Sequence, residues 1–232
     1  LYWHRFFRLD NSPATEGCGV FERVKHKWYF YWLLLVAFIP TAVVGLAVKK
    51  LGMIDFLLNP ENALWVVPVM LVVGGVFMLF CDRIFNKGKD ENSVTERRAF
   101  WIGFIQCISM IPGVSRSMAT IVGGMSQNLT RKKAAEFSFF LAVPTMAAAT
   151  GLDVLELFMG DKAVGANWAT SENLILLAVG SIVAFFVALV AMKWFVDFLA
   201  KYGFKVFGWY RIFVGLIILG MLLAGVDLKL ID

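Results

Sequence analysis

The sequence is poor in charge. Only 17% of its 232 residues are Asp, Glu, Lys or Arg, whereas 59% are hydrophobic. Soluble domains carry about 25% charged residues. The uncharged runs cover residues 28–48, 62–81, 137–152, 173–192 and 212–226. Because about 20 apolar residues are needed to cross a bilayer, these runs exclude a soluble protein. They predict five transmembrane helices in a single membrane domain over residues 1–232.

Cysteine is also scarce, and the three cysteines, Cys18, Cys81 and Cys107, are odd in number and lack CxxC spacing. That pattern argues against a disulfide framework or a metal site. The only histidines, His4 and His26, lie outside the uncharged runs, where interfacial or solvated roles suit them better than catalysis.

The sequence begins at Leu1 instead of methionine and shows no signal-peptide pattern. Residues 1–27 are basic and aromatic, as at the cytoplasmic end of a span. We interpret them as a juxtamembrane segment and expect the chain to be a fragment that lacks the beginning of that span.

The basic residues gather between the uncharged runs, and the net charge is +5. If residues 1–27 are cytoplasmic, the cytoplasmic segments hold 17 of the 22 Lys and Arg residues and the outer segments hold 4. This split follows the positive-inside rule, so no nucleic-acid partner is predicted. It requires residues 99–130 to begin and end on one side of the membrane.

Residues 99–130 are predicted to form a re-entrant helix–turn–helix. The 13 residues Ala99–Ile111 reach roughly 20 Å as a helix, less than the hydrocarbon thickness of about 30 Å. Pro112 and Gly113 then turn the chain back. A capping box at Ser93–Glu96 is expected to open the first helix, and Thr130 to cap the helix that follows the hairpin.

The turn carries the most informative residues. Arg116 is the only charge in residues 99–130, and an arginine at such depth costs about 2.5–3.5 kcal/mol. A second helix is expected to begin near Ser115–Ser117, with its amides and positive dipole end directed at the turn. The predicted anion site comprises Gly113, Ser115, Arg116, Ser117 and Thr120. In the alternative, Arg116 pairs with a carboxylate of another span and the hydroxyls satisfy backbone groups.

The segment Pro112–Thr120 reads P-G-V-S-R-S-M-A-T and matches in full the P-G-x-S-R-S-x-x-T motif of bacterial undecaprenyl-diphosphate phosphatases, the bacitracin-resistance family. The flanking segments Gly103–Cys107, Gly123-Gly124, Ala135–Phe139 and Ala142–Pro144 resemble that family too. The resemblance extends from near Leu1 to the final span, and a motif of this length is specific.

The resemblance implies hydrolysis of undecaprenyl diphosphate to undecaprenyl phosphate and inorganic phosphate in the bacterial inner membrane, which recycles the lipid carrier for peptidoglycan synthesis. It implies a fold of inverted repeats, of which this chain would hold the second part, with two re-entrant loops and an active site open to the outer face. Arg116 and Ser115 would be catalytic, and Gly113, Ser117 and Thr120 would complete the diphosphate site. Gln106 and Glu136 are further candidates for lining the pocket.

The implied partners are a polyprenyl diphosphate lipid and the surrounding membrane lipids; homo-oligomerisation stays open. The implied cofactor is a divalent cation, Mg²⁺ or Ca²⁺. The family also has an amino-terminal (E/Q)-x-x-x-E motif that supplies metal-binding carboxylates. That motif is absent from this sequence. The acidic residues that precede the first full span are only Asp10, Glu16 and Glu22. We therefore expect residues 1–232 alone to be inactive.

Two other functions are alternatives to the phosphatase. A secondary transporter or lipid flippase also uses broken helices that bind anions at the midplane, and the local pattern alone does not separate it from an enzyme. The type-2 phosphatidic-acid phosphatases need a histidine after the Ser-Arg segment, and none follows His26, which excludes them.

Overall fold

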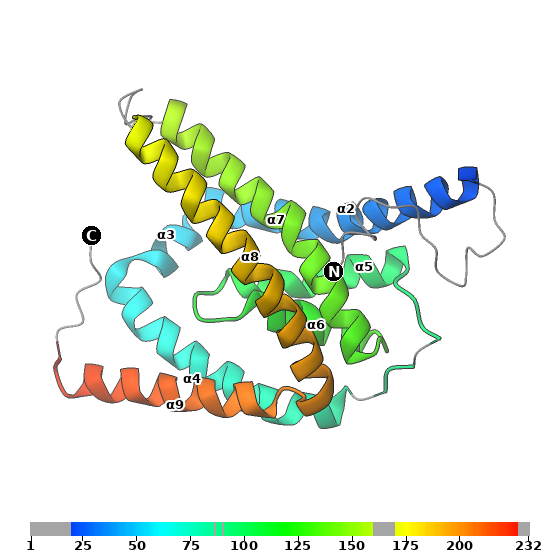
Figure 1. The fold of residues 1–232 in the computed structure, drawn as a ribbon. Coiled ribbons are helices and arrows are strands. Elements are labelled where there is room, and N and C mark those ends of the chain that lie inside the picture. The colour runs from blue at the N-terminus through cyan, green and yellow to red at the C-terminus, as the bar shows by residue number, and fades with distance from the viewer. Residues whose placement is uncertain (1–19, 86, 90, 160–169, 227–232) are drawn as a thin grey trace. The chain divides into compact units, whose positions relative to one another are not determined.

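The computed structural model describes residues 20–85, 87–89, 91–159 and 170–226, and every regular element in those ranges is helical (Figure 1). The elements are α2 (Val20–Lys50), α3 (Met53–Leu58), α4 (Pro60–Ile84), α5 (Glu96–Gln106), the 3₁₀ turn η1 (Cys107–Met110), α6 (Arg116–Ser126), α7 (Arg131–Met159), α8 (Ser171–Tyr202) and α9 (Lys205–Leu223).

Five of these helices contain a stretch long and apolar enough to cross a membrane. The stretches are Trp28–Lys50, Asn62–Ile84, Arg131–Leu152, Glu172–Tyr202 and Lys205–Leu223. The prediction of an all-α polytopic membrane protein with about five spans is confirmed. The last two stretches differ most from the uncharged runs, because α8 continues to Tyr202 and α9 begins at Lys205.

The chain divides into two compact units. The first contains residues 1–29 and 142–197, and the second, which we call the hairpin unit, contains residues 30–141 and 198–232. In the first unit, no residue of the most apolar stretch of α8 is buried. A helix that is apolar on all sides and exposed is suited to face lipid.

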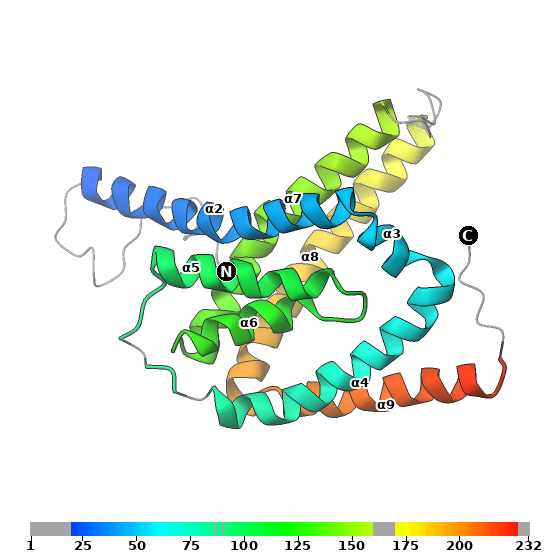
Figure 2. The same ribbon diagram turned by 180° about the vertical axis from the view of Figure 1, so that it is seen from behind.

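The hairpin unit contains the predicted helix–turn–helix. Figures 1 and 2 show α5 and α6 as two short helices that run back along one another and are joined by η1 and a turn. Each helix has 11 residues and is therefore about 16 Å long. Neither is long enough to cross the hydrocarbon core of a bilayer.

The capping box expected at Ser93–Glu96 is wrong. Helix α5 begins at Glu96 itself, its N-cap is Thr95, and Thr95 makes no side-chain capping bond. The Glu96 carboxylate instead accepts a hydrogen bond of 2.9 Å from the indole N–H of Trp32 on α2. A contact between residues 64 apart in the chain therefore replaces the local one.

The hairpin is enclosed by protein on the α2 side. A Cβ atom on Gly103 of α5 would lie 1.9 Å from the carbonyl oxygen of Ala37 on α2, so only glycine permits this approach. The Thr41 hydroxyl donates to the Gly103 carbonyl at 3.0 Å. Packing against protein is what the predicted re-entrant position would require of the hairpin.

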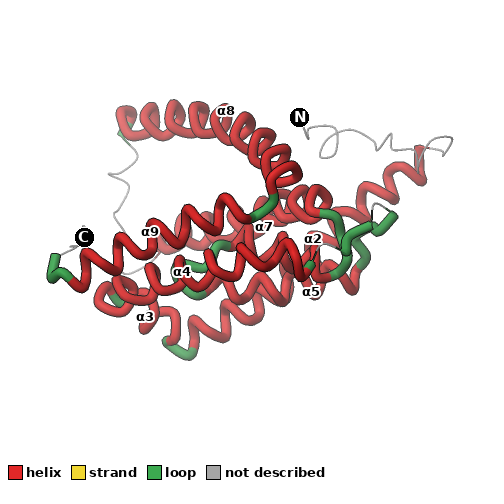
Figure 3. Tube along the Cα trace, turned by 90° about the horizontal axis from the view of Figure 1, so that it is seen from below, coloured by secondary structure: helices red, strands yellow, loops and turns green. Residues whose placement is uncertain are grey.

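Helices α4 and α9 pack along one another in the hairpin unit, as Figures 2 and 3 show from two directions. Their backbones approach closely at Gly75 and Gly208, because a Cβ on either residue would lie 2.8 Å from the carbonyl oxygen of the other. Small residues at such crossings are typical of membrane helix pairs, in which close van der Waals packing drives association.

An ion pair and a hydrogen bond at Asp82 connect the end of α4 with the starts of α7 and α9. Asp82, near the end of α4, lies 3.1 Å from the Nε atom of Arg131 at the start of α7. Its second carboxylate oxygen accepts a 2.8 Å hydrogen bond from the amide of Phe204, between α8 and α9. Thr130 caps α7 as predicted, since its hydroxyl accepts from the amide of Lys133 at 3.4 Å.

Candidate functional site

The turn between η1 and α6 has the features of a type II β-turn. Pro112 and Gly113 occupy its central positions, Gly113 has a φ of 87°, and the Val114 amide donates to the Ile111 carbonyl at 3.1 Å. A positive φ at the third residue is what this turn requires, and glycine adopts it without strain. The turn lies against α4, because a Cβ on Gly113 would lie 2.6 Å from the Val67 carbonyl oxygen.

Ser115 caps α6. Its backbone is extended, and its hydroxyl oxygen accepts a hydrogen bond from the amide of Met118 at 3.3 Å. The same hydroxyl lies 3.1 Å from that of Ser117. The expected helix start near Ser115–Ser117 is therefore confirmed, and the cap leaves the first amides of α6 directed toward the turn.

Arg116 is the first residue of α6 and is half-buried. The residue therefore begins the helix at the positive end of its dipole, where an anion is bound favourably. The geometry thus gathers the turn, two serine hydroxyls and one arginine at a single helix terminus, an arrangement suited to a phosphate group.

Thr120 lies one turn further along α6 and is 2% exposed. Its hydroxyl bonds to the Arg116 carbonyl at 3.0 Å and meets the hydroxyl of Ser138 on α7. The structure therefore directs Thr120 at α7. That Thr120 also contacts a diphosphate stays a prediction.

The two further candidates lie on other elements. Gln106, at the end of α5, is 1% exposed, and its side-chain amide donates to the Thr41 hydroxyl of α2 at 3.0 Å. The side-chain oxygen Oε1 of Gln106 is buried without a hydrogen-bond partner among the described residues. Glu136 is buried on α7, two residues before Ser138. The contact to Thr41 places the Gln106 amide on the α2 side of the hairpin.

Sequence reasoning missed Arg211. The uncharged run begins at Ile212, so the distribution of charge assigns Arg211 to the preceding cytoplasmic segment. In the structure it is the seventh residue of α9, inside a span, and it donates from Nη2 to the Gly113 carbonyl. An arginine inside a span usually marks a functional site. The signal that could have found it is the helical continuity of residues 205–211.

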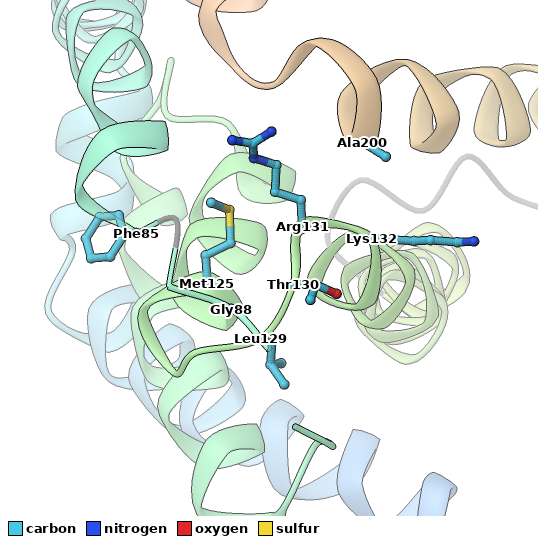
Figure 4. Close-up of a pocket in the computed structure, with 8 residues that line it drawn as sticks. All are labelled: Phe85, Gly88, Met125, Leu129, Thr130, Arg131, Lys132 and Ala200. Carbon is cyan, nitrogen blue, oxygen red and sulfur yellow. The ribbon is translucent and has the colours of Figure 1, made fainter. Parts of the chain in front are cut away.

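A pocket of about 250 Å³ lies at the other end of α6. Figure 4 shows its lining, with Met125 and Leu129 from the end of the hairpin and Arg131 and Lys132 from the start of α7. Ser126, the last residue of α6, is about 16 Å along the helix from the turn. The pocket is therefore separate from the candidate phosphate site.

The described residues do not fit a divalent cation of their own. In the ranges that the structure covers, no three His, Cys, Asp or Glu side chains lie close enough together to hold a metal ion. Cys81 and Cys107 are free thiols. The groups gathered at the turn are hydroxyls, amides and guanidinium, which suit anions and not Mg²⁺ or Ca²⁺.

Comparison with known proteins identifies the family of this chain. The family model for BacA, the bacitracin resistance protein, matches residues 1–217. The chain belongs to the BacA family. It is 45% identical over 229 residues to an undecaprenyl-diphosphatase from Porphyromonas gingivalis, covering 98% of this chain and 78% of that protein.

Two further BacA-family relatives bear the same name. The chain is 49% identical over 199 residues to an undecaprenyl-diphosphatase from Flavobacterium psychrophilum, with coverage of 86% of this chain and 72% of the relative. It is 41% identical over 235 residues to one from Bdellovibrio bacteriovorus, with coverage of 100% and 78%. With five apolar spans, this member of the BacA family is a multi-pass bacterial inner-membrane protein.

Proposed function

We propose that this protein hydrolyses undecaprenyl diphosphate to undecaprenyl phosphate and inorganic phosphate, and that the turn and the start of α6 bind the diphosphate. The observation that carries the proposal is the capped helix terminus, at which Ser115 caps α6 and Arg116 is its first residue. Relatives named undecaprenyl-diphosphatase at 45% and 49% identity support the choice of substrate.

Hydrolysis of a diphosphate requires stabilisation of the negative charge that develops on the leaving group. Hydrolysis breaks the bond between the terminal phosphorus and the bridging oxygen, and water supplies the new oxygen of inorganic phosphate. Negative charge grows on the bridging oxygen, which leaves with the lipid phosphate. The Arg116 guanidinium and the amides at the start of α6 stabilise that charge, and the Ser115 and Ser117 hydroxyls orient the phosphate oxygens.

The fold explains why a membrane protein does this work. The polyprenyl tail cannot leave the bilayer, so its headgroup has to be bound at the membrane. In this proposal, two helices of about 16 Å joined by a turn hold the anion site inside the membrane. The packing of Gly103 against Ala37 supports it, because protein then lies beside the hairpin. The tail then stays in lipid while the diphosphate reaches protein donors.

The divalent cation implied by the resemblance belongs to the same proposal, with its ligands outside the residues assigned above. The binding steps proposed for this chain use protein groups alone. We further propose that residues 1–232 alone release little phosphate, because the (E/Q)-x-x-x-E motif is absent from the sequence.

Binding and hydrolysis are tested separately. The purified chain in detergent is titrated with farnesyl diphosphate, a short prenyl diphosphate, and Arg116→Ala is expected to weaken binding by about tenfold or more, as for loss of a charged hydrogen bond. Lys132→Ala, an exposed charge at the pocket of Figure 4, is the matched control and should bind as the wild type. If the wild-type chain does not bind the diphosphate, the proposed function is wrong.

Hydrolysis is measured as phosphate release from undecaprenyl diphosphate. The chain alone is compared with a fusion that carries, ahead of Leu1, the segment that precedes the matching region in the Porphyromonas gingivalis relative. The fusion is expected to be active, and Arg116→Ala in the fusion inactive. Uptake of the lipid diphosphate into vesicles without phosphate release would instead favour the transporter or flippase.

A further inference from the structure

Arg211 connects the last span to the phosphate-binding turn. Its Nη2 atom donates to the carbonyl oxygen of Gly113, 98 residues away in the chain. Its Nε atom is buried without a hydrogen-bond partner. Within the part of the chain that the structure describes, Arg211 forms no ion pair. In the described ranges, it is therefore the turn and not a carboxylate that this guanidinium contacts.

The surrounding helices are shaped to permit this contact. A Cβ on Gly74 of α4 would lie only 3.1 Å from the Nη2 atom of Arg211. The absence of a side chain at Gly74 therefore leaves room for the guanidinium beside α4. The close approach of Gly75 and Gly208 brings α9 near enough to reach the turn. The turn itself lies against Val67 of α4. Helix α4 thus contacts both the turn and the arginine that donates to it.

The hydrogen bond fixes the peptide that leads into the site. The carbonyl of the Gly113–Val114 peptide is held by Arg211, and its N–H is held by the Ile111 carbonyl at 3.1 Å. This peptide directly precedes Ser115, the cap of α6. Its orientation therefore sets where the Ser115 hydroxyl and the first amides of α6 point. The guanidinium of Arg211 also offsets the partial negative charge of the Gly113 carbonyl oxygen, which would otherwise repel a nearby phosphate.

We propose that Arg211 is a positioning residue for diphosphate binding, acting through the Gly113 carbonyl. This inference rests on the proposed function. Preorganised donors bind an anion better than mobile ones because no ordering is needed on binding. Loss of the Arg211 bond should therefore weaken diphosphate binding even though Arg116, Ser115 and Ser117 are unchanged.

The test compares Arg211→Met, which removes the donor and keeps an unbranched stem, with Arg211→Lys, which keeps one donor. Arg211→Met removes a charge from a span, so its membrane insertion is not impaired. In the farnesyl diphosphate titration we expect Arg211→Met to weaken binding by about tenfold or more and Arg211→Lys to recover most of that loss. Arg83→Met, at the exposed end of α4, is the matched control and should bind as the wild type.

A spectroscopic measurement separates positioning from direct contact. Labelling glycine carbonyls with ¹³C and valine amides with ¹⁵N selects four Gly–Val peptides, which end at Val20, Val76, Val114 and Val226. The Val114→Ile variant identifies the signal of the 113–114 peptide by its loss. Arg211→Met is expected to shift that signal before any ligand is added, and Arg83→Met to leave it in place.

The outcomes are distinct. If the wild type and Arg211→Met bind the diphosphate equally well while Arg116→Ala does not bind it, the proposed function stands and the role of Arg211 is wrong. If Arg211→Met weakens binding but the 113–114 signal is unchanged, Arg211 acts by contacting the ligand and the positioning role is overturned. If the wild type does not bind, the proposed function itself fails.

Discussion

Single residues at the start of α6 each have a local structural task besides any task in binding. Ser115 shows this most clearly, because its hydroxyl oxygen caps the helix by accepting from Met118 and also lies beside Ser117. A substitution that removes the hydroxyl therefore changes helix stability and phosphate binding together. A residue that caps the helix as well as serine but repels phosphate separates the effect on helix stability from the effect on phosphate binding.

Aspartate at position 115 provides that separation. As an N-cap Asp is about equal to Ser, whereas Ala costs about 1 kcal/mol. We expect Ser115→Asp to keep the thermal unfolding midpoint of the wild type in detergent and to lose farnesyl diphosphate binding, because its carboxylate repels the ligand. Ser115→Ala should lower the midpoint and weaken binding less. Wild-type affinity in Ser115→Asp would show that Ser115 does not face the diphosphate.

The residue scale also shows where sequence reasoning stops. The cap at Ser115 was predictable, because helix N-caps depend on local residue type. The role of Glu96 was not, because its carboxylate is engaged by Trp32, 64 residues away. Arg211 was missed for a similar reason: its partner, the Gly113 carbonyl, lies on another element, and a count of charges assigns the residue to a loop.

At the scale of elements, the α4–α9 pair depends on glycine. A Cβ on Gly208 would lie 2.8 Å from the Gly75 carbonyl oxygen, a backbone atom that cannot move alone. Gly220, further along α9, has nothing within 4 Å of the same position. The two glycines occupy one helix and differ only in what faces them, so they form a matched pair.

We expect Gly208→Ala to separate the helices and to destabilise the protein by about 1–3 kcal/mol, as overpacking does. Because Arg211 is one turn further along α9, the same shift should weaken its bond to Gly113 and reduce farnesyl diphosphate binding. Gly220→Ala should be neutral or stabilising by up to about 1 kcal/mol through helix propensity. Thermal unfolding in detergent measures both. Equal midpoints for the two variants would contradict the close packing.

The elements themselves were largely predictable from charge and length. Each uncharged run of residues falls within or close to one helix, because a charged side chain inside a span is unfavourable. The short hairpin was predictable because 13 residues are too few to cross the hydrocarbon core. Helix ends were less predictable: α8 continues to Tyr202 and α9 begins at Lys205. Lys201 and Lys205 lie at those ends, where long basic side chains extend to the interface.

At the scale of the whole molecule, the hairpin decides the topology. If residues 99–130 turn back inside the membrane, the segments before and after them lie on the same side, and the basic segments all become cytoplasmic. If they crossed once, every later segment would change sides. Lys87 precedes the hairpin, Lys132 follows it, and Leu51 lies one span earlier; all three are exposed.

Cysteine labelling tests this directly. In a variant with Cys18, Cys81 and Cys107 replaced by serine, a single cysteine is placed at position 51, 87 or 132. A membrane-impermeant maleimide should label position 51 in intact spheroplasts, and positions 87 and 132 only after the membrane is permeabilised. Leu177, exposed on the apolar face of α8, is the control and should stay unlabelled in both states. Labelling of position 132 but not 87 in intact spheroplasts would mean that the hairpin crosses the membrane, and a phosphate site at its turn would no longer be held inside the bilayer.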